Sequence, residues 1–389
     1  MKKKLLFVIN SLGCGGAEKS LVSLLSVLDY EAYDAYLQMF NPGGMFLDLL
    51  PGKVNVLPRL PYFEYCDKGG FNPRFFAAKT ATSIALRLRP RVGGRPLHDA
   101  QIFWKHAGGA IDADPVQYDA AIAWGQGNPT HYVAEKITAK RKIAFINADY
   151  EAVGHNKFFD KSFYSKYDFI ATVSDKLKEK IASVFPEFSE KIAVVYDIRN
   201  QALMERMALE GDPFGKPHKV PVLVTVGRMV ASKGYDLAVC AAAELKKRGL
   251  PFLWYFVGDG PESGRIKSAI SESGLSYSVR LVGAVSNPYP YIKNADVYVQ
   301  TSLNEGFCLT LCEARGLGVP PVSTDFDAVY DQLRDGENGL IVNKTPEAIA
   351  DGIGRLMNDR VLYLRISEEL KNERIGNEKE IEKLYEMIG

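Results

Sequence analysis

Short apolar runs alternate with amphipathic stretches along the chain. The first run, Leu5 to Ile9, is followed by the glycine-rich turn 13–16 and by leucines at helical spacing, which predicts a strand, a loop and a helix. Further strands are predicted at residues 120–124, 143–146, 169–173 and 192–196. Strands that alternate with helices in this way predict a parallel sheet covered by helices.

The same alternation starts again after a polar stretch with proline and glycine, residues 211–218. Strands are predicted at residues 222–226, 252–257, 279–282, 297–300 and 321–323. A chain of 389 residues also exceeds what one hydrophobic core usually organises. We therefore predict an α/β protein with two doubly wound, Rossmann-like domains, residues 1–200 and 201–372, which face each other across a cleft. A charged helix at about 373–389 should pack back on the first domain.

The composition is that of an ordinary soluble globular protein, with 47% hydrophobic and 24% charged residues. A formal net charge of +1 argues against a nucleic-acid partner, because neutralising phosphates needs a basic excess. Five cysteines without a CxxC pair predict neither disulfides nor a zinc site and fit a reducing cytoplasm. The first apolar run stops at Asn10, so we interpret it as a buried strand and not as a signal peptide.

The segment from Arg74 to His106 departs from the even distribution of charge. Within the segment its cations are opposed only by Asp99, and they are interleaved with apolar residues such as Phe76 and Ile84. Two interpretations stay open. The segment is either an amphipathic helix that lies on an anionic membrane surface, or a solvated helix and loop.

Two carboxylates eight residues apart are the main chemical signal of the second domain. Glu305 lies in a loop, and Glu313 lies about two turns into the helix that is predicted to follow. Carboxylates accept paired hydrogen bonds from hydroxyl groups, which suits the two ends of a nucleotide-sugar. Gly306 lets the backbone approach a ligand and presents amides at the start of that helix.

A second loop, Gly227 to Gly234, follows a predicted strand and carries Arg228 and Lys233. Arginine forks two phosphate oxygens and lysine supplies a compact charge, so this pair suits a diphosphate that leaves without the help of a metal. Partners in surface ion pairs would be the alternative if the motif stood alone.

Together with their neighbours, these loops give the second half a specific resemblance. The motifs are, in chain order, Gly227-Arg228 with Lys233-Gly234, Val257-Gly-Asp-Gly-Pro261, Val282-Gly283, Ala295-Asp296, Ser302, Glu305-Gly-Phe307 with Glu313-Ala314, and Gly318-Val-Pro-Pro-Val322. Over about residues 220–345 the chain resembles the retaining enzymes of glycosyltransferase family 4. The resemblance implies the GT-B fold.

The resemblance also implies roles for residues. Glu305 would contact the hydroxyls of the donor sugar, Glu313 the ribose, and Arg228 and Lys233 the diphosphate. The nucleotide-sugar would further be bordered by Gly15, Gly16, Gly227, Gly258, Val282, Gly283, Gly306, Phe307, Cys308, Leu309 and Thr310. No metal and no resident cofactor are implied. The nucleoside-diphosphate sugar, often linked to UDP in relatives, is a co-substrate.

The first domain supplies two further candidates, which follow the strand 143–146. Many relatives carry histidine where Asn147 stands, in a region that meets the donor sugar near its C6 hydroxyl. Asparagine can still form hydrogen bonds, but unlike histidine its side chain does not gain or lose a proton near neutral pH. Asp149 is a candidate for binding or activating the acceptor hydroxyl, and a helix-capping or loop role is the alternative.

Three further patterns in the sequence could indicate dinucleotide binding or metal binding, but each has a better explanation. Residues 13–15 echo a dinucleotide-binding fingerprint, but Glu18 stands where its third glycine belongs. Residues 112–114 and 325–327 match a metal-binding DxD signature, yet solvated or capping roles are favoured for such short matches. His106, His131 and His155 have no second ligand at the spacing of a metal site. We therefore interpret these three histidines as structural residues.

The resemblance thus implies the transfer, with retention, of a hexose or N-acetylhexosamine to a hydroxyl of a glycan or polyprenyl-lipid-linked acceptor. Bacterial cell-surface polysaccharide synthesis is the expected context, in the cytoplasm or on the inner face of the membrane. Two alternatives stay open. One is a GT-B-fold sugar-nucleotide epimerase, which needs no acceptor. The other is a non-catalytic subunit that binds nucleotide-sugar, which Asn147 keeps open.

Overall fold

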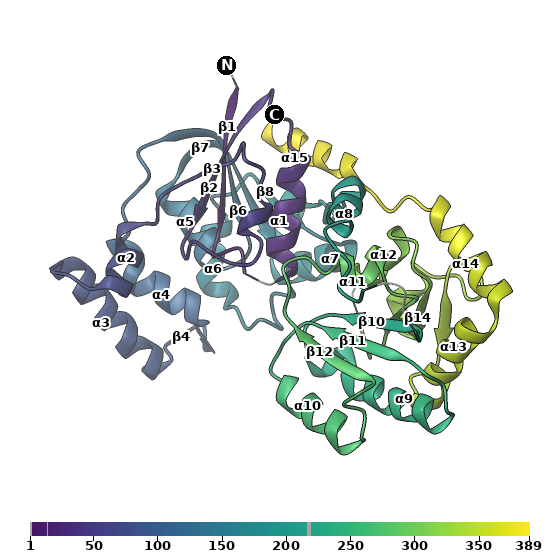
Figure 1. The fold of residues 1–389 in the computed structure, drawn as a ribbon. Coiled ribbons are helices and arrows are strands. Elements are labelled where there is room, and N and C mark those ends of the chain that lie inside the picture. Colours follow the sequence, from purple (N-terminus) through teal and green to yellow (C-terminus); the bar gives the residue numbers. More distant parts are fainter. Residues whose placement is uncertain (1, 14, 216–218, 306) are drawn as a thin grey trace. The chain divides into compact units, whose positions relative to one another are not determined.

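The computed structural model describes residues 2–13, 15–215, 219–305 and 307–389 (Figure 1). Contacts divide the chain into two compact units. The first is Met1–Arg199 with Asn377–Gly389, and the second is Asn200–Gly376. These limits differ by a few residues from the domains predicted at 1–200 with 373–389 and at 201–372.

A seven-stranded sheet organises the first unit, with the strand order β3-β2-β1-β6-β7-β8-β9. All neighbouring strands in it are parallel. The strands are β1 Lys3–Ile9, β2 Tyr33–Met39, β3 Asn55–Val56, β6 Gln117–Trp124, β7 Thr138–Ile146, β8 Phe169–Thr172 and β9 Ile192–Val194. The order reverses between β1 and β6, which places a topological switch point at their carboxyl ends.

Helices cover both faces of this sheet. They are α1 Gly16–Ser26, α2 Pro61–Lys68, α3 Pro73–Leu88, α4 Asp99–Ala107, α5 Asn128–Lys136, α6 Lys157–Tyr164, α7 Asp175–Val184 and α15 Ile381–Ile388. The small strands β4 Arg91–Val92 and β5 Arg95–Pro96 pair antiparallel as a separate hairpin. Successive residues of β1 enter different cores, Leu6 on one face and Leu5 and Phe7 on the other. Burial on both faces explains why this strand is a continuous apolar run.

The carboxyl-terminal helix α15 packs on the first unit, as predicted. Its Tyr385 ring stacks on Tyr33 with the ring centroids 4.9 Å apart, and the Tyr385 hydroxyl accepts a hydrogen bond from the amide of Asp29 at 2.8 Å. In Figure 1 the yellow helix α15 lies close to the purple helix α1. The helix begins at Ile381, later than predicted, because residues 373–377 are not helical and Glu378–Glu380 form a short 3-10 turn.

A six-stranded parallel sheet organises the second unit, with the order β12-β11-β10-β13-β14-β15. Its strands are β10 Val222–Val226, β11 Leu253–Val257, β12 Val279–Gly283, β13 Val297–Gln300, β14 Pro321–Thr324 and β15 Leu340–Val342. Its helices are α8 Gln201–Ala208, α9 Tyr235–Lys247, α10 Ser263–Glu272, α11 Tyr289–Lys293, α12 Leu309–Gly316, α13 Pro346–Asn358 and α14 Arg360–Asn372. The prediction of two Rossmann-like halves with parallel sheets is confirmed.

No helix in the described ranges is long and apolar enough to cross a membrane.

Candidate functional site

Two loops meet at the switch point of the second sheet, where the strand order reverses between β10 and β13. The loop after β10 carries Ser232 and Lys233, and the loop after β13 carries Thr301 to Glu305. The Leu303 amide donates to the Ser232 carbonyl at 2.8 Å, and the Thr301 hydroxyl donates to the Lys233 carbonyl at 3.1 Å. The two sequence motifs are therefore joined directly, at the edge where open parallel sheets bind ligands.

Lys233 and Glu305 form an ion pair across these loops. The ammonium donates to Oε1 of Glu305 at 2.5 Å, and the two side chains are 22% and 14% exposed. An ammonium has three donors, so Lys233 keeps donors for a phosphate while it holds the carboxylate. The sequence predicted that Lys233 contacts the diphosphate and Glu305 the sugar, but it did not predict their contact with each other.

A chain of buried hydrogen bonds orients the Glu305 carboxylate. Tyr298 donates to Gln300 at 2.6 Å, Gln300 donates to Ser302 at 2.6 Å, and Ser302 donates to Glu305 at 2.6 Å. The first three residues are almost completely buried. Satisfied buried networks of this kind fix side-chain geometry. The sequence signal for Gln300 was only its place at the end of a strand.

Glycines let the loops of this site approach one another. Gly234 has φ +65°, and a Cβ there would lie 2.0 Å from the Thr301 carbonyl oxygen. Gly258 has φ +144°, and its Cβ would lie 2.0 Å from the carbonyl oxygen of Gly227. The amide of Gly258 also donates to the Gly283 carbonyl at 2.8 Å. The glycines predicted at 227, 258 and 283 therefore lie together, next to the Lys233 loop.

Gly234→Ala should disturb both stability and the site. The left-handed backbone costs an alanine about 1–2 kcal/mol, and the clash with Thr301 adds about 1–3 kcal/mol. The matched control is Gly249→Ala, because Gly249 has φ +71° and nothing within 4 Å of its Cβ position. Urea unfolding should show a clearly larger loss for Gly234→Ala. Equal losses in the two variants would contradict the close approach of the loops.

Arg228 follows β10 in the same loop as Lys233. Its side chain is exposed, and it makes no hydrogen bond or ion pair with the described residues beyond its own backbone. The arrangement leaves a guanidinium that can turn toward a phosphate without first breaking a protein contact.

The helix α12 begins in an unusual way. Cys308 at its N-cap has φ +65° and ψ +71°, makes no capping hydrogen bond with its side chain, and is buried. Left-handed backbone in a residue other than glycine is uncommon and strained, and strained residues cluster at functional sites. The amides of the first turn, Leu309 and Thr310 among them, stand at the positive end of the helix dipole. Gly306, predicted as a contact here, lies outside the described residues.

The Cys308 thiol should be unreactive in the folded protein. Burial raises its pKa to about 12, so the nucleophilic thiolate is scarce at neutral pH, while Cys240 is exposed. Iodoacetamide at pH 8 should label Cys240 quickly and leave Cys308 unmodified until the protein unfolds. The raised pKa also means that stability contributed by the neutral thiol is lost as pH rises above about 8.5, its unfolded pKa. Peptide mass mapping checks the labelling, and equal labelling of both thiols would contradict it.

Glu313 of α12 is 6% exposed. Oε1 of its carboxylate accepts a hydrogen bond from the hydroxyl of Tyr289 in α11 at 3.2 Å. Tyr289 was not predicted, and nothing in its sequence surroundings marks it. Phe307, another predicted contact, precedes α12 and is 37% exposed. Val282 lies in β12, one residue before Gly283.

The remaining predicted residues lie in the first unit. Asn147 follows β7, and both polar atoms of its amide are buried without a hydrogen-bond partner among the described residues. Gly15 and Gly16 form the N-cap and the first residue of α1. A Cβ on Gly15 would lie 2.2 Å from the Glu18 carboxylate. These positions follow β7 and β1, on the carboxyl-end side of the first sheet.

Asp149 makes the contacts of a capping residue. It accepts hydrogen bonds from the amides of Glu151 and Ala152 at 3.1 and 3.2 Å and pairs with Lys180 of α7. The Lys180 hydrogen bond lowers the pKa of Asp149, which makes it a weaker base. The two amide contacts are those expected for the loop alternative.

The positive charge of the basic segment 74–106 is partly neutralised by carboxylates that lie outside this segment in the sequence. Arg74 pairs with Asp112 at 2.7 Å, and Arg95 lies 3.8 Å from Glu151. Arg89 pairs with Asp99 inside the segment. Asp112, part of one DxD match, is thus an ion-pair partner, and within the described part of the chain no group of three His, Cys, Asp or Glu residues could hold a metal ion.

Part of the chain, including the loops of this site, is similar to known proteins. Residues 210–373 match the family described as glycosyl transferases group 1. Over 163 residues the chain is 31% identical to the lipopolysaccharide core biosynthesis glycosyltransferase LpsE of Rhizobium meliloti (strain 1021), covering 42% of this chain and 47% of LpsE. The chain thus spans about half the length of LpsE, and less of two further relatives.

A longer match covers almost the whole chain. Over 366 residues it is 25% identical to the N-acetylgalactosamine-N,N'-diacetylbacillosaminyl-diphospho-undecaprenol 4-alpha-N-acetylgalactosaminyltransferase of Campylobacter jejuni subsp. jejuni serotype O:2, covering 92% of this chain and 91% of that protein. The enzyme class predicted from the sequence, a glycosyltransferase, is confirmed at the level of the family domain and of these relatives.

Solved structures confirm the fold. Anabaena HepE in complex with UDP and glucose aligns with a TM-score of 0.63 at 16% identity over 99% of both chains. TarM aligns with a TM-score of 0.66 at 15% identity, over 100% of this chain and 99% of TarM. Both are GT-B glycosyltransferases. At such identities the likeness shows the GT-B fold predicted from the sequence and nothing finer.

Proposed function

We propose that this protein transfers a hexose or N-acetylhexosamine from a UDP-sugar to a hydroxyl of a glycan or polyprenyl-lipid-linked acceptor, with retention at the anomeric carbon, in bacterial cell-surface polysaccharide synthesis. The observation that carries this proposal is the junction of the Lys233 and Glu305 loops at the switch point of the second sheet. A cation, an oriented carboxylate and a helix start meet there.

The donor would lie along this edge of the sheet. Lys233, Arg228 and the first amides of α12 would hold the diphosphate, because positive charge and unpaired amides both favour phosphate. Glu305 would accept hydrogen bonds from the sugar hydroxyls, and Glu313 from the ribose. As the sugar leaves, charge grows on the diphosphate, and these fixed donors stabilise it. The leaving diphosphate would take the acceptor proton on the same face.

The names of similar proteins support the finer parts of the proposal. HepE was solved with UDP and glucose, which favours UDP as the nucleotide. The Campylobacter relative acts, by its name, on a sugar carried by diphospho-undecaprenol. CapM of Staphylococcus aureus, 29% identical over 205 residues, is named for capsular polysaccharide biosynthesis. A lipid-linked acceptor in the cytoplasmic leaflet therefore fits best.

Ligand binding followed by product analysis tests the proposal. A ligand at 100 times its Kd stabilises the folded state by about 2.7 kcal/mol, so UDP should raise the melting temperature by several degrees, and more than GDP or ADP. Incubation with UDP-sugars and a polyprenyl-diphosphate-linked sugar should then extend the acceptor. An epimerised sugar nucleotide from donor alone would show an epimerase, and UDP binding without any turnover a non-catalytic subunit.

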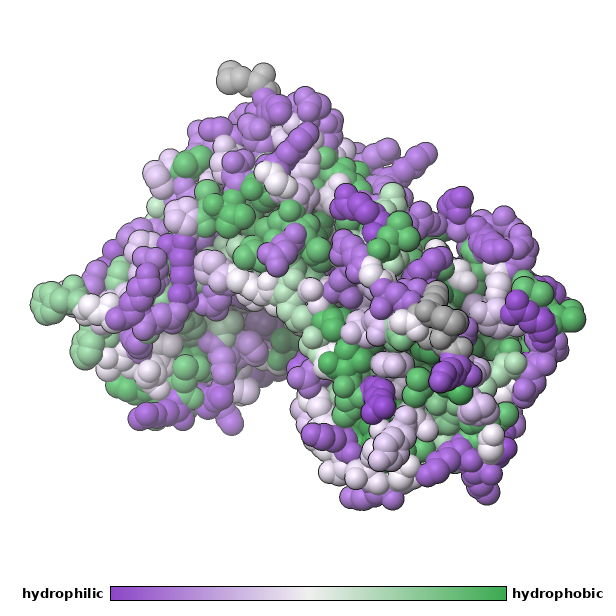
Figure 2. Space-filling view, in the orientation of Figure 1, coloured by the Kyte–Doolittle hydropathy of each residue, from purple (hydrophilic) through white to green (hydrophobic). Residues whose placement is uncertain are grey.

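We propose further that α3 places the enzyme on an anionic membrane. Phe76, Ile84 and Leu88 are 63%, 53% and 75% exposed and recur at multiples of four residues along α3. Arg87 and Arg91 are exposed beside them. In Figure 2 the region of α2 and α3, at the left edge, shows apolar side chains among hydrophilic ones. Apolar side chains next to cations suit a surface of anionic lipids.

The double variant Ile84→Ser with Leu88→Ser should weaken vesicle binding. Losing two exposed apolar side chains should lower partition into phosphatidylglycerol vesicles by about tenfold or more. The matched control is Val361→Ser with Leu364→Ser, which removes two exposed apolar side chains of α14. Vesicle sedimentation measures both. Equal binding by the two double variants, or binding to neutral phosphatidylcholine alone, would contradict the role of α3.

A further inference from the structure

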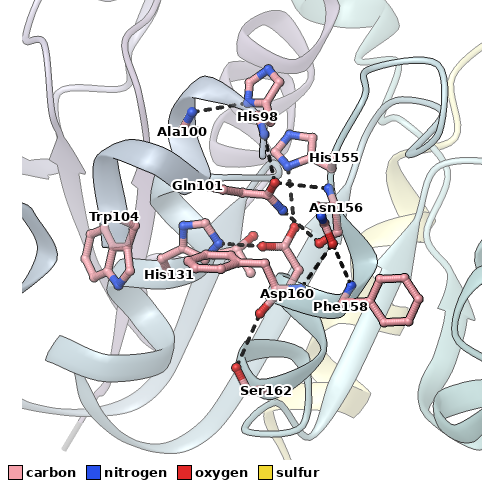
Figure 3. Close-up of polar contacts among 12 residues, drawn as sticks. His98, Ala100, Gln101, Trp104, His131, His155, Asn156, Phe158, Asp160 and Ser162 are labelled. Carbon is pink, nitrogen blue, oxygen red and sulfur yellow. Dashed lines mark hydrogen bonds and ion pairs between the residues drawn. The ribbon is translucent and has the colours of Figure 1, made fainter. Parts of the chain in front are cut away.

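Asp160 of α6 is a buried carboxylate in the first unit, 1% exposed. Nε2 of His131 lies 2.8 Å from one carboxylate oxygen, and the Tyr150 hydroxyl donates to the other at 2.6 Å. Nδ1 of His155 lies 3.4 Å from that second oxygen. Figure 3 shows Asp160 between His131 and His155. Two histidines that look isolated in the sequence therefore share one carboxylate.

These contacts keep the carboxylate charged. Burial raises the pKa of Asp160, but the hydrogen bonds with His131 and Tyr150, together with the nearby His155 ring, outweigh burial and hold the pKa well below its usual range. A charge in the interior persists only where its partners are fixed. The arrangement around Asp160 is consequently rigid, and moving any one partner costs the contacts of the others.

The partners of Asp160 come from both loops that follow the central strands of the sheet. His131 lies in the first turns of α5, directly after the loop Gly125–Gly127 that ends β6. Tyr150 and His155 belong to the 147–156 loop, which follows β7. Gly127 lies close to the second loop, because a Cβ added at this position would lie 3.5 Å from Cε1 of His155. One carboxylate thus ties helix α5 to the 147–156 loop at the carboxyl-end edge of this sheet.

The far end of the 147–156 loop is fixed independently. The Asn156 amide donates to the carbonyls of Val92 and Arg95 at 2.8 and 2.9 Å. Gln101 of α4 accepts from the Asn156 backbone amide and donates to its carbonyl, both at 3.0 Å. Between the two ends, residues 151–154 are exposed. Tyr150, three residues after Asn147, is 1% exposed. It is therefore the buried residue of this loop that lies nearest to Asn147 in the sequence.

We propose that Asp160 is a positioning residue for the loop that carries Asn147. Through Tyr150 and His131 it holds the 147–156 loop, and with it the unpartnered amide of Asn147, in register with the loop after β6. The inference rests on the proposed function for its kinetic consequence only. Asp160 touches no substrate in this proposal and acts through the loop.

Tyr150→Phe tests the proposal, because it removes one hydrogen bond to Asp160 and keeps the ring. The matched control is Tyr118→Phe. Tyr118 is 2% exposed and its hydroxyl donates to Asp114 at 3.0 Å, near the start of β6 and away from the loop. Losing a hydrogen bond to a carboxylate should speed amide exchange of residues 147–155 by about tenfold in Tyr150→Phe only. Hydrogen exchange followed by mass spectrometry measures this.

Kinetics give the second readout. Tyr150→Phe should lower kcat/KM for sugar transfer by about tenfold, while the shift in melting temperature caused by UDP stays that of the wild type. Asp160→Asn, if it folds, should show a larger change in the same direction. Loop exchange or transfer kinetics that match those of Tyr118→Phe would overturn the positioning role. A wild-type protein that neither binds UDP nor transfers sugar would overturn the proposed function instead, and the exchange result would still decide the role of Asp160.

Discussion

Glu305→Gln is expected to lower kcat by about two to three orders of magnitude, the range measured when one preorganised hydrogen bond that stabilises a transition state is lost. The substitution keeps the size of the side chain and removes its charge. The sugar hydroxyls then lose their strongest acceptor, and Lys233, at 2.5 Å from this carboxylate, loses its partner. Steady-state kinetics at saturating UDP-sugar measure the effect.

Glu373→Gln is the matched control for Glu305. Glu373 pairs with Arg315 at 2.6 Å, both side chains are 14% exposed, and the pair lies in the same unit. Losing either pair should lower stability by similar amounts. Only Glu305→Gln should lower kcat strongly. If both variants lose activity in proportion to their loss of stability, the Glu305 carboxylate has no special role in transfer.

Arg228→Ala is expected to lower kcat by about ten- to a hundredfold, because one charged contact to the leaving diphosphate disappears. The stability of the protein should stay nearly unchanged, since the guanidinium is exposed and makes no ion pair with the described residues. A separate loss of kcat without a loss of stability distinguishes a binding role from a structural one. Thermal unfolding and kinetics on the same preparation give both numbers.

Arg355→Ala provides the comparison for Arg228. Arg355 is exposed in α13 and borders an open depression of about 730 Å³ together with Arg248 and Leu250. Leu250 precedes β11, so this depression lies at the amino-end edge of the sheet, opposite the proposed site. Wild-type kinetics are expected. A similar fall in kcat for both arginines would point to a general effect of surface charge.

Contiguous motifs made the donor side predictable. Gly234 and Gly258 need their positive φ for local reasons that any glycine-rich strand-to-helix loop shares. Because the carboxyl ends of parallel strands share one edge, the order of strands and loops already placed Arg228, Lys233 and Glu305 on the same side of the second sheet.

The contact between Lys233 and Glu305 was not predictable in the same way. They are 72 residues apart and meet only because β10 and β13 are neighbours in the sheet. Alternation of strands and helices does not specify which strands become neighbours. The same limit applies to Tyr289, whose hydroxyl reaches Glu313 from a different helix.

By itself, the sequence determined the α/β class, the two halves and the chemistry of the loops, since periodicity and glycine positions act over a few residues. Only the tertiary structure decided which side chains form ion pairs and hydrogen bonds with each other. It joined His131 and His155 to Asp160, gave Arg74 a counter-ion outside the basic segment, and assigned Asp149 to Lys180. The physical reason is that the charge and hydrogen bonding of a side chain depend on desolvation and on distances in space, and chain folding sets both.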